Sequence, residues 1–408
     1  MTKKTDTPAI RFKGFSDTWE QRKLGDVVQI TMGQSPDGST YSDEPSDYIL
    51  VQGNADLQNG WVCPRIWTTQ ITKKADAGDL IMSVRAPAGA MGKTAYNAVI
   101  GRGVAAIKGN EFIYQLLVKM DADGFWKILS CGSTFESLNS ENIKNAEVKI
   151  PTTAEQIKIG GYFQQLDHLI TLHQREYEKL HNIKKSMLEK MFPKNGSNVP
   201  EIRFKGFTEA WEQRKLLEFG LATGGTSIES EFSEDGVYKV ISIGSYSEDN
   251  VYRDQGIRAV RSDKTVNRIL NKGDITMILN DKTASGNIIG RVLLIEESGV
   301  YVYNQRTERI EVDNSNYDSQ FIYTMLNAPA IRDRIIKQSQ GNTQIYVNWT
   351  TISQTDYLVP QFSEQRKIGE YFANLDHLIT LHQRELEKLQ NIKKSMLEKM
   401  FVSEEKRK

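Results

Sequence analysis

The sequence predicts an α+β protein in which two mixed α/β lobes are joined by two long antiparallel helices, a coiled coil with pseudo-two-fold symmetry. Three observations lead to this prediction. A short segment at 10–24 recurs at 202–216, a long helical segment at 151–192 recurs at 360–401, and the segments between these repeats hardly resemble each other. The short segment and the long helical segment are therefore duplicated, whereas the lobes between them are not.

The short repeat, called here the lead, reads IRFKGFSDTWEQRKL in its first copy and IRFKGFTEAWEQRKL in its second. Each copy precedes a lobe and contains a tryptophan, Trp19 or Trp211, which we expect to anchor the lead on a hydrophobic surface. The leads are offset by 192 residues (202 − 10) and the long repeats by 209 (360 − 151). The second lobe is therefore longer by 17 residues (209 − 192).

The long repeats are identical at 33 of 42 positions and predict long helices. Their apolar residues recur at alternating spacings of four and three, which is the period of a coiled-coil seam. The predicted helix-pair interface comprises Leu166, Ile170, His173, Tyr177, Leu180, Leu375, Ile379, His382, Leu386 and Leu389. An ordinary amphipathic helix that packs only on its own lobe is the alternative interpretation. The seam histidines could hold a metal, but we expect packed, hydrogen-bonded imidazoles and assign no metal site.

The order of the segments predicts the direction of helix pairing. A breaker that contains Pro193 and Gly196, and then the second lead, follow the first helix, so the second lobe begins at the end of that helix where the first lobe does not lie. The second lobe then enters the second helix from the same end. Antiparallel pairing therefore places the lobes at opposite ends of a rod and brings the end of the second helix near the first lead.

Both lobes are expected to contain short strands and helices. Apolar runs at 79–85 and 274–280, each preceded by glycine, are typical of buried strands. Helical patterns follow later in each lobe, at 112–120 and 320–327.

Composition excludes several classes of protein. The 408 residues carry 52 basic and 52 acidic side chains, so no global field indicates a nucleic-acid partner. The apolar runs are far shorter than the ~20 residues of a membrane span, and MTKKTDTPAI lacks the apolar block of a signal peptide, so we expect a cytoplasmic protein without a membrane partner. All five histidines lie in the long repeats, which makes a histidine-dependent catalytic site in a lobe improbable.

Positive charge is concentrated locally in the first lobe. The segment 80–110 has no acidic residue but contains Arg85, Lys93, Arg102 and Lys108 among several glycines. Arginine and lysine beside glycine suit contacts to DNA phosphates and base edges. A solvated basic face without a ligand is the alternative.

The second lobe has an acid-free segment of its own at 337–355. It contains Gln344, Tyr346 and Asn348, whose side chains can hydrogen-bond base edges. The first lobe has a related polar segment, 132–138, at the same distance before its helix. An ordinary polar loop explains either segment equally well.

Glycine-containing loops follow the first strand of each lobe at 33–36 and 224–227, but they lack the lysine of a phosphate-binding loop. The candidate DNA-binding residues are Gln34, Ser35, Arg85, Lys93, Arg102, Thr134, Thr226, Lys282, Arg306, Gln344, Tyr346 and Asn348. We find no methyltransferase, Rossmann, Walker or nuclease motif, so the chain is expected to be non-catalytic.

The ordered combination of lead, variable lobe and long helix, twice over, resembles the specificity subunit of type I restriction-modification systems. Local stretches are similar as well, among them GDLIMSVRAP from Gly78, NDKT from Asn280 and EQ-x-KIG from Glu155 and Glu364. The resemblance implies that each lobe is a target recognition domain that reads one half of a split DNA target. It implies that the helices act as a spacer between the two halves.

The resemblance also implies partners. Two methyltransferase subunits would bind S-adenosylmethionine and methylate an adenine in each half-site, and a restriction subunit that uses ATP and Mg²⁺ would cleave unmodified DNA; this chain would bind no cofactor. Repeated residues outside the seam are candidates for partner docking, namely Asn182, Lys185, Glu189, Asn391, Lys394 and Glu398. A recent duplication could also explain their repetition.

The expected organisation assigns each segment a part. Residues 10–150 form recognition domain 1 with its lead, 151–192 the first helix, 193–201 a linker, 202–359 recognition domain 2 with its lead, 360–401 the second helix, and 402–408 a charged tail. Two rival functions remain open. A bivalent protein-binding adaptor would use the same frame without DNA specificity, and an enzyme with an unrecognised active site would act without any partner.

Overall fold

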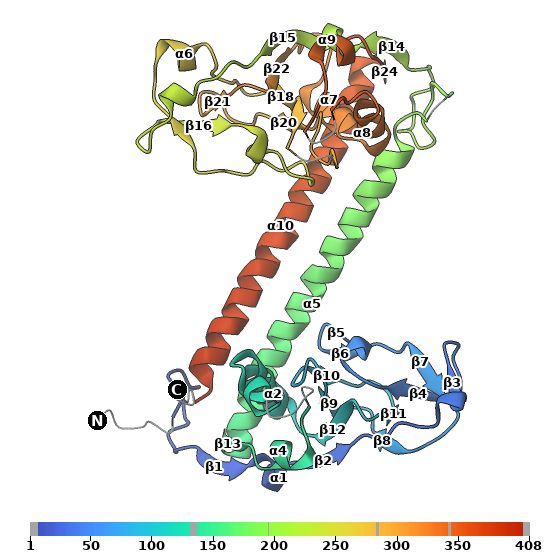
Figure 1. The fold of residues 1–408 in the computed structure, drawn as a ribbon, viewed down its shortest axis with the longest axis vertical. Coiled ribbons are helices and arrows are strands. Elements are labelled where there is room, and N and C mark those ends of the chain that lie inside the picture. The colour runs from blue at the N-terminus through green and yellow to red at the C-terminus, as the bar shows by residue number, and fades with distance from the viewer. Residues whose placement is uncertain (1–6, 131–136, 195, 283–284, 342–343, 403–408) are drawn as a thin grey trace. The chain divides into compact units, whose positions relative to one another are not determined.

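The computed structural model describes residues 7–130, 137–194, 196–282, 285–341 and 344–402. The chain divides into compact unit 1, Met1–Arg175 with His382–Lys408, and compact unit 2, Glu176–Leu381. The divisions fall inside the long helices α5 (Thr153–Lys190) and α10 (Phe362–Met400) rather than at their ends. Each unit therefore combines one lobe with part of both helices (Figure 1).

The long helices run antiparallel within each unit. In unit 1, Asp167 of α5 pairs with Lys393 of α10 at 2.6 Å, and His173, later in α5, lies beside His382, earlier in α10. In unit 2, Lys184 of α5 pairs with Asp376 at 2.5 Å. Because residue numbers rise along one helix as they fall along the other, the predicted antiparallel pairing is confirmed.

Each lead is fixed to the start of one helix and the end of the other. Arg11 forms a bidentate ion pair with buried Glu155 in the first turn of α5, with both contacts at 2.7 Å. The backbone amide of the preceding residue, Ile10, donates a hydrogen bond to the carbonyl of Lys399 near the end of α10. In unit 2 the second lead repeats both contacts, with Arg203–Glu364 at 2.7 Å and Ile202 N–H to Lys190 O at 2.9 Å. These repeated contacts explain why the lead sequence occurs twice.

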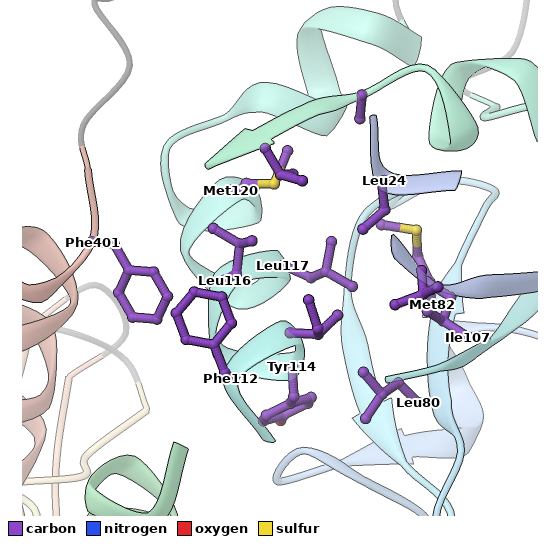
Figure 2. Close-up of a cluster of buried hydrophobic side chains, with 14 of the residues drawn as sticks. Leu24, Leu80, Met82, Ile107, Phe112, Tyr114, Leu116, Leu117, Met120 and Phe401 are labelled. Carbon is purple, nitrogen blue, oxygen red and sulfur yellow. The ribbon is translucent and has the colours of Figure 1, made fainter. Parts of the chain in front are cut away.

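The core of unit 1 is closed by a residue from the far end of the chain. Phe401, just after α10, stacks on Phe112 at a centroid distance of 5.1 Å and contacts Trp19 and Phe163 edge-on or tilted. Figure 2 shows Phe401 beside Phe112 on one side of α2, with the sheet residues Leu80, Met82 and Ile107 on the other. All four aromatic residues are almost fully buried, so the first lobe is completed by the second helix.

Unit 2 repeats this arrangement with residues from the end of the first helix. Phe192, just after α5, lies against Trp211, Phe321 and Phe372 at centroid distances of 5.9 to 6.2 Å. The tryptophans Trp19 and Trp211 are each only 3% exposed, in agreement with the anchoring role expected for them.

Lobe 1 contains two main sheets, as counted over the described residues. One has the strand order β2-β12-β9-β10-β6-β5 and the other β3-β7-β4-β11-β8, while β1 pairs with β13 at the helix end of the lobe. The strands are β1 (Glu20–Lys23), β2 (Gln29–Met32), β3 (Tyr41–Ser42), β4 (Tyr48–Val51), β5 (Leu57–Gln58), β6 (Trp61–Val62), β7 (Ile66–Thr68), β8 (Lys73–Ala75), β9 (Leu80–Ser83), β10 (Met91–Lys93), β11 (Ala98–Ile100), β12 (Val104–Lys108) and β13 (Glu147–Ile150). The helices are α1 (Leu24–Val27), α2 (Glu111–Ala122), α3 (Phe125–Ser130) and α4 (Ser140–Lys144).

Lobe 2 has the corresponding sheets β15-β22-β18-β20 and β17-β16-β21, with β14 paired to β24 and β19 to β23. The strands are β14 (Glu212–Lys215), β15 (Gly220–Gly224), β16 (Tyr238–Ile241), β17 (Arg258–Ala259), β18 (Ile275–Ile278), β19 (Asn280–Asp281), β20 (Val292–Leu294), β21 (Tyr301–Tyr303), β22 (Thr307–Val312), β23 (Ile345–Tyr346) and β24 (Asp356–Val359). The helices are α6 (Asp263–Val266), α7 (Ser319–Leu326), α8 (Pro329–Ile336) and α9 (Trp349–Ile352). The predicted α+β class with long paired helices is confirmed.

The described helices include none that combines the length and the apolar character of a membrane span.

We expect Phe401→Ala to loosen unit 1 selectively. The substitution removes a ring that is 1% exposed, and truncations of this kind typically cost about 3–5 kcal/mol of unfolding free energy. Hydrogen exchange followed by mass spectrometry should show faster exchange in peptides from α2, with peptides of lobe 2 unchanged. Phe192→Ala should give the opposite pattern, and Leu381→Ala, at a side chain that is 46% exposed, should give neither. Equal acceleration in both units by Phe401→Ala would contradict the proposed closure of unit 1.

Candidate nucleic-acid interface

The loops that follow β2, β4 and β9, together with the turn between β11 and β12, meet around a hollow of about 270 Å³ in lobe 1. Its polar lining consists of Ser35, Gln52, Asn54, Ser83, Arg85 and Arg102. Three of the predicted DNA-binding residues, Ser35, Arg85 and Arg102, are therefore brought together, although 67 residues separate the first from the last.

Backbone contacts hold the rim of the hollow in place. The amide of Gly33 donates to the carbonyl of Val104 at 3.0 Å, and the amide of Arg102 donates to Oγ of Ser35 at 3.1 Å. A Cβ at Gly33 would lie 2.1 Å from the carbonyl oxygen of Gly101, which no side chain can tolerate. Glycine is therefore required there by a close backbone approach, and the predicted loop after the first strand owes its glycine to packing.

The guanidinium groups of Arg85 and Arg102 are exposed and have no ion-pair partner among the described residues. No carboxylate belongs to the described lining of the hollow. The nearby carboxylate of Asp56 is buried and accepts bonds from Arg65 at 2.9 Å and from the amide of Gln52 at 2.7 Å. Among the residues that the structure describes, no carboxylate therefore offsets the positive charge of Arg85 and Arg102 in the hollow.

Lobe 2 builds its corresponding loops with the same backbone bonds. The amide of Gly225 donates to Thr307 O as Gly33 does to Val104, and a Cβ at Gly225 would lie 2.1 Å from Asn304 O. The amide of Leu279 donates to Arg306 O as Val84 does to Gly103. Counting along the chain from these pairs places Asn280 where lobe 1 has Arg85, and Gln305 where lobe 1 has Arg102.

The other predicted residues of lobe 2 lie in and around the same loops. Lys282 and Gln344 are exposed next to the β19–β23 pair, and exposed Arg306 adopts a positive φ of 70° in the turn before β22. Tyr346 pairs with Asn280 across β19 and β23 and donates its hydroxyl to Gln340 at 3.0 Å.

Hydrogen bonds already occupy two further predicted side chains of lobe 2. Asn348 caps α9 by accepting the amide of Thr350 at 3.0 Å. Thr226 accepts a hydrogen bond from Arg268 at 2.9 Å.

Lys93 does not belong to the hollow. Its ammonium pairs with Glu111 at 3.1 Å, lies over the rings of Trp61 and Tyr114, and has a side chain only 13% exposed. Gln115 links Glu111 onward to Asp167 of α5, so Lys93 ties lobe 1 to its helix rather than offering charge to a ligand. We therefore leave Lys93 out of the proposed interface.

Of the remaining candidates in lobe 1, Gln34 is exposed on the loop after β2, and Thr134 lies outside the described residues. Sequence reasoning missed Gln52 and Asn54 in lobe 1 and Asn280 and Gln305 in lobe 2. The position of Gln52 at the end of an apolar strand was a usable signal. Gln52 directly follows the strand Tyr48–Val51, and Arg85 likewise comes shortly after β9.

The predicted seam residues of the helices are all buried or half-buried. The Nδ1 atoms of His173 and His382 are 3.0 Å apart, so one imidazole donates to the other. The described residues add no third metal-binding side chain to this pair. All six candidate docking residues, Asn182, Lys185, Glu189, Asn391, Lys394 and Glu398, are exposed.

Lobe 2 also buries a carboxyl group beside the loops that correspond to the rim of the lobe 1 hollow. Glu308, on β22 two residues after Arg306, is 6% exposed, and burial raises its pKa to about 7, a rise that the charge of Arg268 only partly offsets. This carboxyl group consequently takes up a proton near neutral pH.

Comparison with known proteins identifies a family. The family model described as "Type I restriction modification DNA specificity domain" matches residues 16–182 and again residues 208–391. The putative type I restriction enzyme MjaX specificity subunit of Methanocaldococcus jannaschii is 29% identical over 182 residues, which cover 42% of either chain. The MjaVIII specificity subunit of the same organism is 25% identical over 292 residues, 70% of this chain and 67% of that one. The chain thus matches less than half the length of the first relative.

A solved structure shares the fold. The crystal structure of the type I restriction-modification system S subunit from M. genitalium matches with a TM-score of 0.70 and 16% identity, covering 98% of this chain and 100% of that chain.

We expect Glu308→Gln to stabilise unit 2 above neutral pH. Because the folded pKa of about 7 exceeds the unfolded value of about 4.3, the stability contributed by the protonated carboxyl is complete below pH ~4.3 and is lost as the pH rises through 7. Urea unfolding at pH 4 should not distinguish the variant from the natural protein, whereas at pH 8 the variant should be more stable by on the order of 3 kcal/mol. Glu311→Gln, at an exposed position on the same strand, is the control; identical pH profiles for Glu308→Gln and the natural protein would contradict the expectation.

Proposed function

The chain belongs to the family of type I restriction modification DNA specificity domains, and from this premise we propose that it is the DNA sequence-recognition subunit of a type I restriction-modification complex. Each lobe reads one half of a bipartite target in double-stranded DNA. The paired helices set the spacing between the two halves.

One observation carries the proposal: the reading ends of the two lobes share their backbone frame but not their side chains. The same backbone bonds hold Gly33 and Gly225, yet Arg85 and Arg102 of lobe 1 correspond to Asn280 and Gln305 of lobe 2. A constant frame with different hydrogen-bonding side chains is what two readers of unlike sequences require, because base-edge contacts specify sequence while the fold only positions them.

The repeated surface of the helices supports a second part of the proposal. Because Asn182, Lys185 and Glu189 on α5 recur as Asn391, Lys394 and Glu398 on α10 and all are exposed, the chain offers two alike surfaces to two copies of one partner. We assign these surfaces to two methyltransferase subunits, which bring S-adenosylmethionine. A restriction subunit that uses ATP and Mg²⁺ completes the assembly.

In this proposal the chain is not itself an enzyme, and the catalytic groups belong to its partners. The complex acts on DNA in the cytoplasm.

The decisive test is a chain with two copies of the second reader. In this chain, residues 24–150 are replaced by residues 216–359, and both leads and both helices are kept. The joins are compatible because the same EQRK segment precedes each lobe and a nearly identical long helix follows it. Mapping of methylated adenines in cells that also express the methyltransferase should show a target in which the half-site of lobe 2 appears twice, in inverted orientation.

The unmodified chain provides the reference, with two different half-sites. A methylation pattern that ignores the exchange would favour a protein-binding adaptor, and methylation by the purified chain without the methyltransferase would favour an enzyme. Either result would overturn the proposal.

A further inference from the structure

The hollow in lobe 1 is lined mainly by hydrogen-bond donors. A guanidinium group can only donate, which applies to Arg85 and Arg102. The Nε2 atom of Gln52 is buried and has no acceptor among the described residues. The hydroxyl of Ser35 already accepts the amide of Arg102, which leaves its O–H free to donate. Asn54 offers a donor and an acceptor.

A donor-rich hollow selects a ligand with adjacent acceptors. Among the base edges of the major groove, only guanine presents two neighbouring acceptors, N7 and O6; adenine pairs its N7 with a donor, cytosine offers a donor, and thymine combines one acceptor with a methyl group. Arginine matches the two guanine acceptors with its two parallel N–H groups.

Backbone phosphate also presents only acceptors, so both DNA groups share the required chemistry. The two lobes distinguish them. Phosphate contacts position a protein on DNA without reading its sequence, so two readers of different sequences have no need to differ at residues that hold only phosphate. At the positions of Arg85 and Arg102, lobe 2 instead has the uncharged residues Asn280 and Gln305, and at the position of Gln52 it has Ser242. Side chains that change between the readers are expected to contact bases.

We propose that the hollow of lobe 1 reads a guanine, contacted by Arg85 or Arg102 or by both, with Gln52 of the lining as an additional specificity-determining residue. The inference rests on the proposed function and adds the class of base to it. The half-site of lobe 1 therefore contains at least one G·C pair whose guanine N7 and O6 face the protein.

The test begins with the natural complex of this chain and its methyltransferase, for which methylation mapping defines the two half-sites. Failure to find a bipartite target would count against the proposed function itself. A bipartite target whose lobe 1 half-site contains only A·T pairs would leave the proposed function standing and overturn the guanine assignment.

The next step replaces each guanine of the lobe 1 half-site by 7-deazaguanine, which lacks the N7 acceptor but keeps its base pairing. At the contacted position we expect binding of the natural complex to weaken, and exchange of that pair for A·T to weaken it about 5- to 150-fold. Because this experiment uses the natural protein, its result does not depend on the folding of any variant. Undiminished binding to every substituted half-site would overturn the proposal.

The variant Arg85→Asn with Arg102→Gln carries the lobe 2 side chains in the lobe 1 hollow. We expect it to bind 7-deazaguanine and guanine equally and to lose the guanine requirement in the methylated motif, while the lobe 2 half-site is unchanged. Arg22→Gln, which removes an exposed charge on β1 outside the hollow, should retain the guanine requirement.

Lysine variants distinguish contacts of the arginines to a base from contacts to a phosphate. Arg85→Lys and Arg102→Lys keep the charge but lose the two-pronged geometry that fits guanine. We expect them to relax the guanine requirement. If they keep the natural motif at full methylation while the neutral variant only lowers methylation at all sites, the arginines hold phosphate and the proposal is wrong.

Discussion

The packing of each lobe on the start of one long helix and the end of the other is the constraint on which the rest of the structure depends. Each lobe contributes the start of one long helix and receives the end of the other, and the received end brings a phenylalanine, Phe401 or Phe192, into the aromatic centre of the core. The leads secure both ends at once, through a partly buried arginine–glutamate pair and one backbone hydrogen bond. The core of each lobe therefore includes residues from both long helices.

This constraint explains why the two halves of the chain diverge so unevenly. Residues that join the leads to the helix ends, such as Trp19 and Glu155, are fixed by packing and charge pairing and recur as Trp211 and Glu364. The loops around the hollow of lobe 1 and their counterparts in lobe 2 lie at strand ends and are held by backbone hydrogen bonds. Their side chains are therefore free to differ, and the difference is one of chemistry: guanidinium groups in lobe 1 occupy the positions that amide groups occupy in lobe 2.

The helices could be predicted because the 3.5-residue spacing of apolar residues and the 33-of-42 identity of the repeats can be read directly from the sequence. The order of the repeated segments then predicted the lobes and the direction of helix pairing. The candidate site was only partly predictable. Lys93 stood in an acid-free stretch, yet the fold places Glu111 beside it, a partner that lies just beyond that stretch in the sequence. Gln52 was missed because its role depends on a loop brought to it from residues 101–103. Which charges remain unpaired is a property of tertiary packing.

The position of Phe401 has a consequence for biosynthesis. The first half of the chain, which holds the aromatic residues of lobe 1, is synthesised up to Phe192 first. The ring that covers these residues belongs to Phe401, which follows 209 residues later (401 − 192). At about 5–20 residues per second, translation of that stretch takes roughly 10 to 40 s, during which the nascent first half exposes Phe112 and Trp19. A neighbouring nascent chain could supply its own helix end to this surface, and chaperones that shield it would favour closure within one polypeptide.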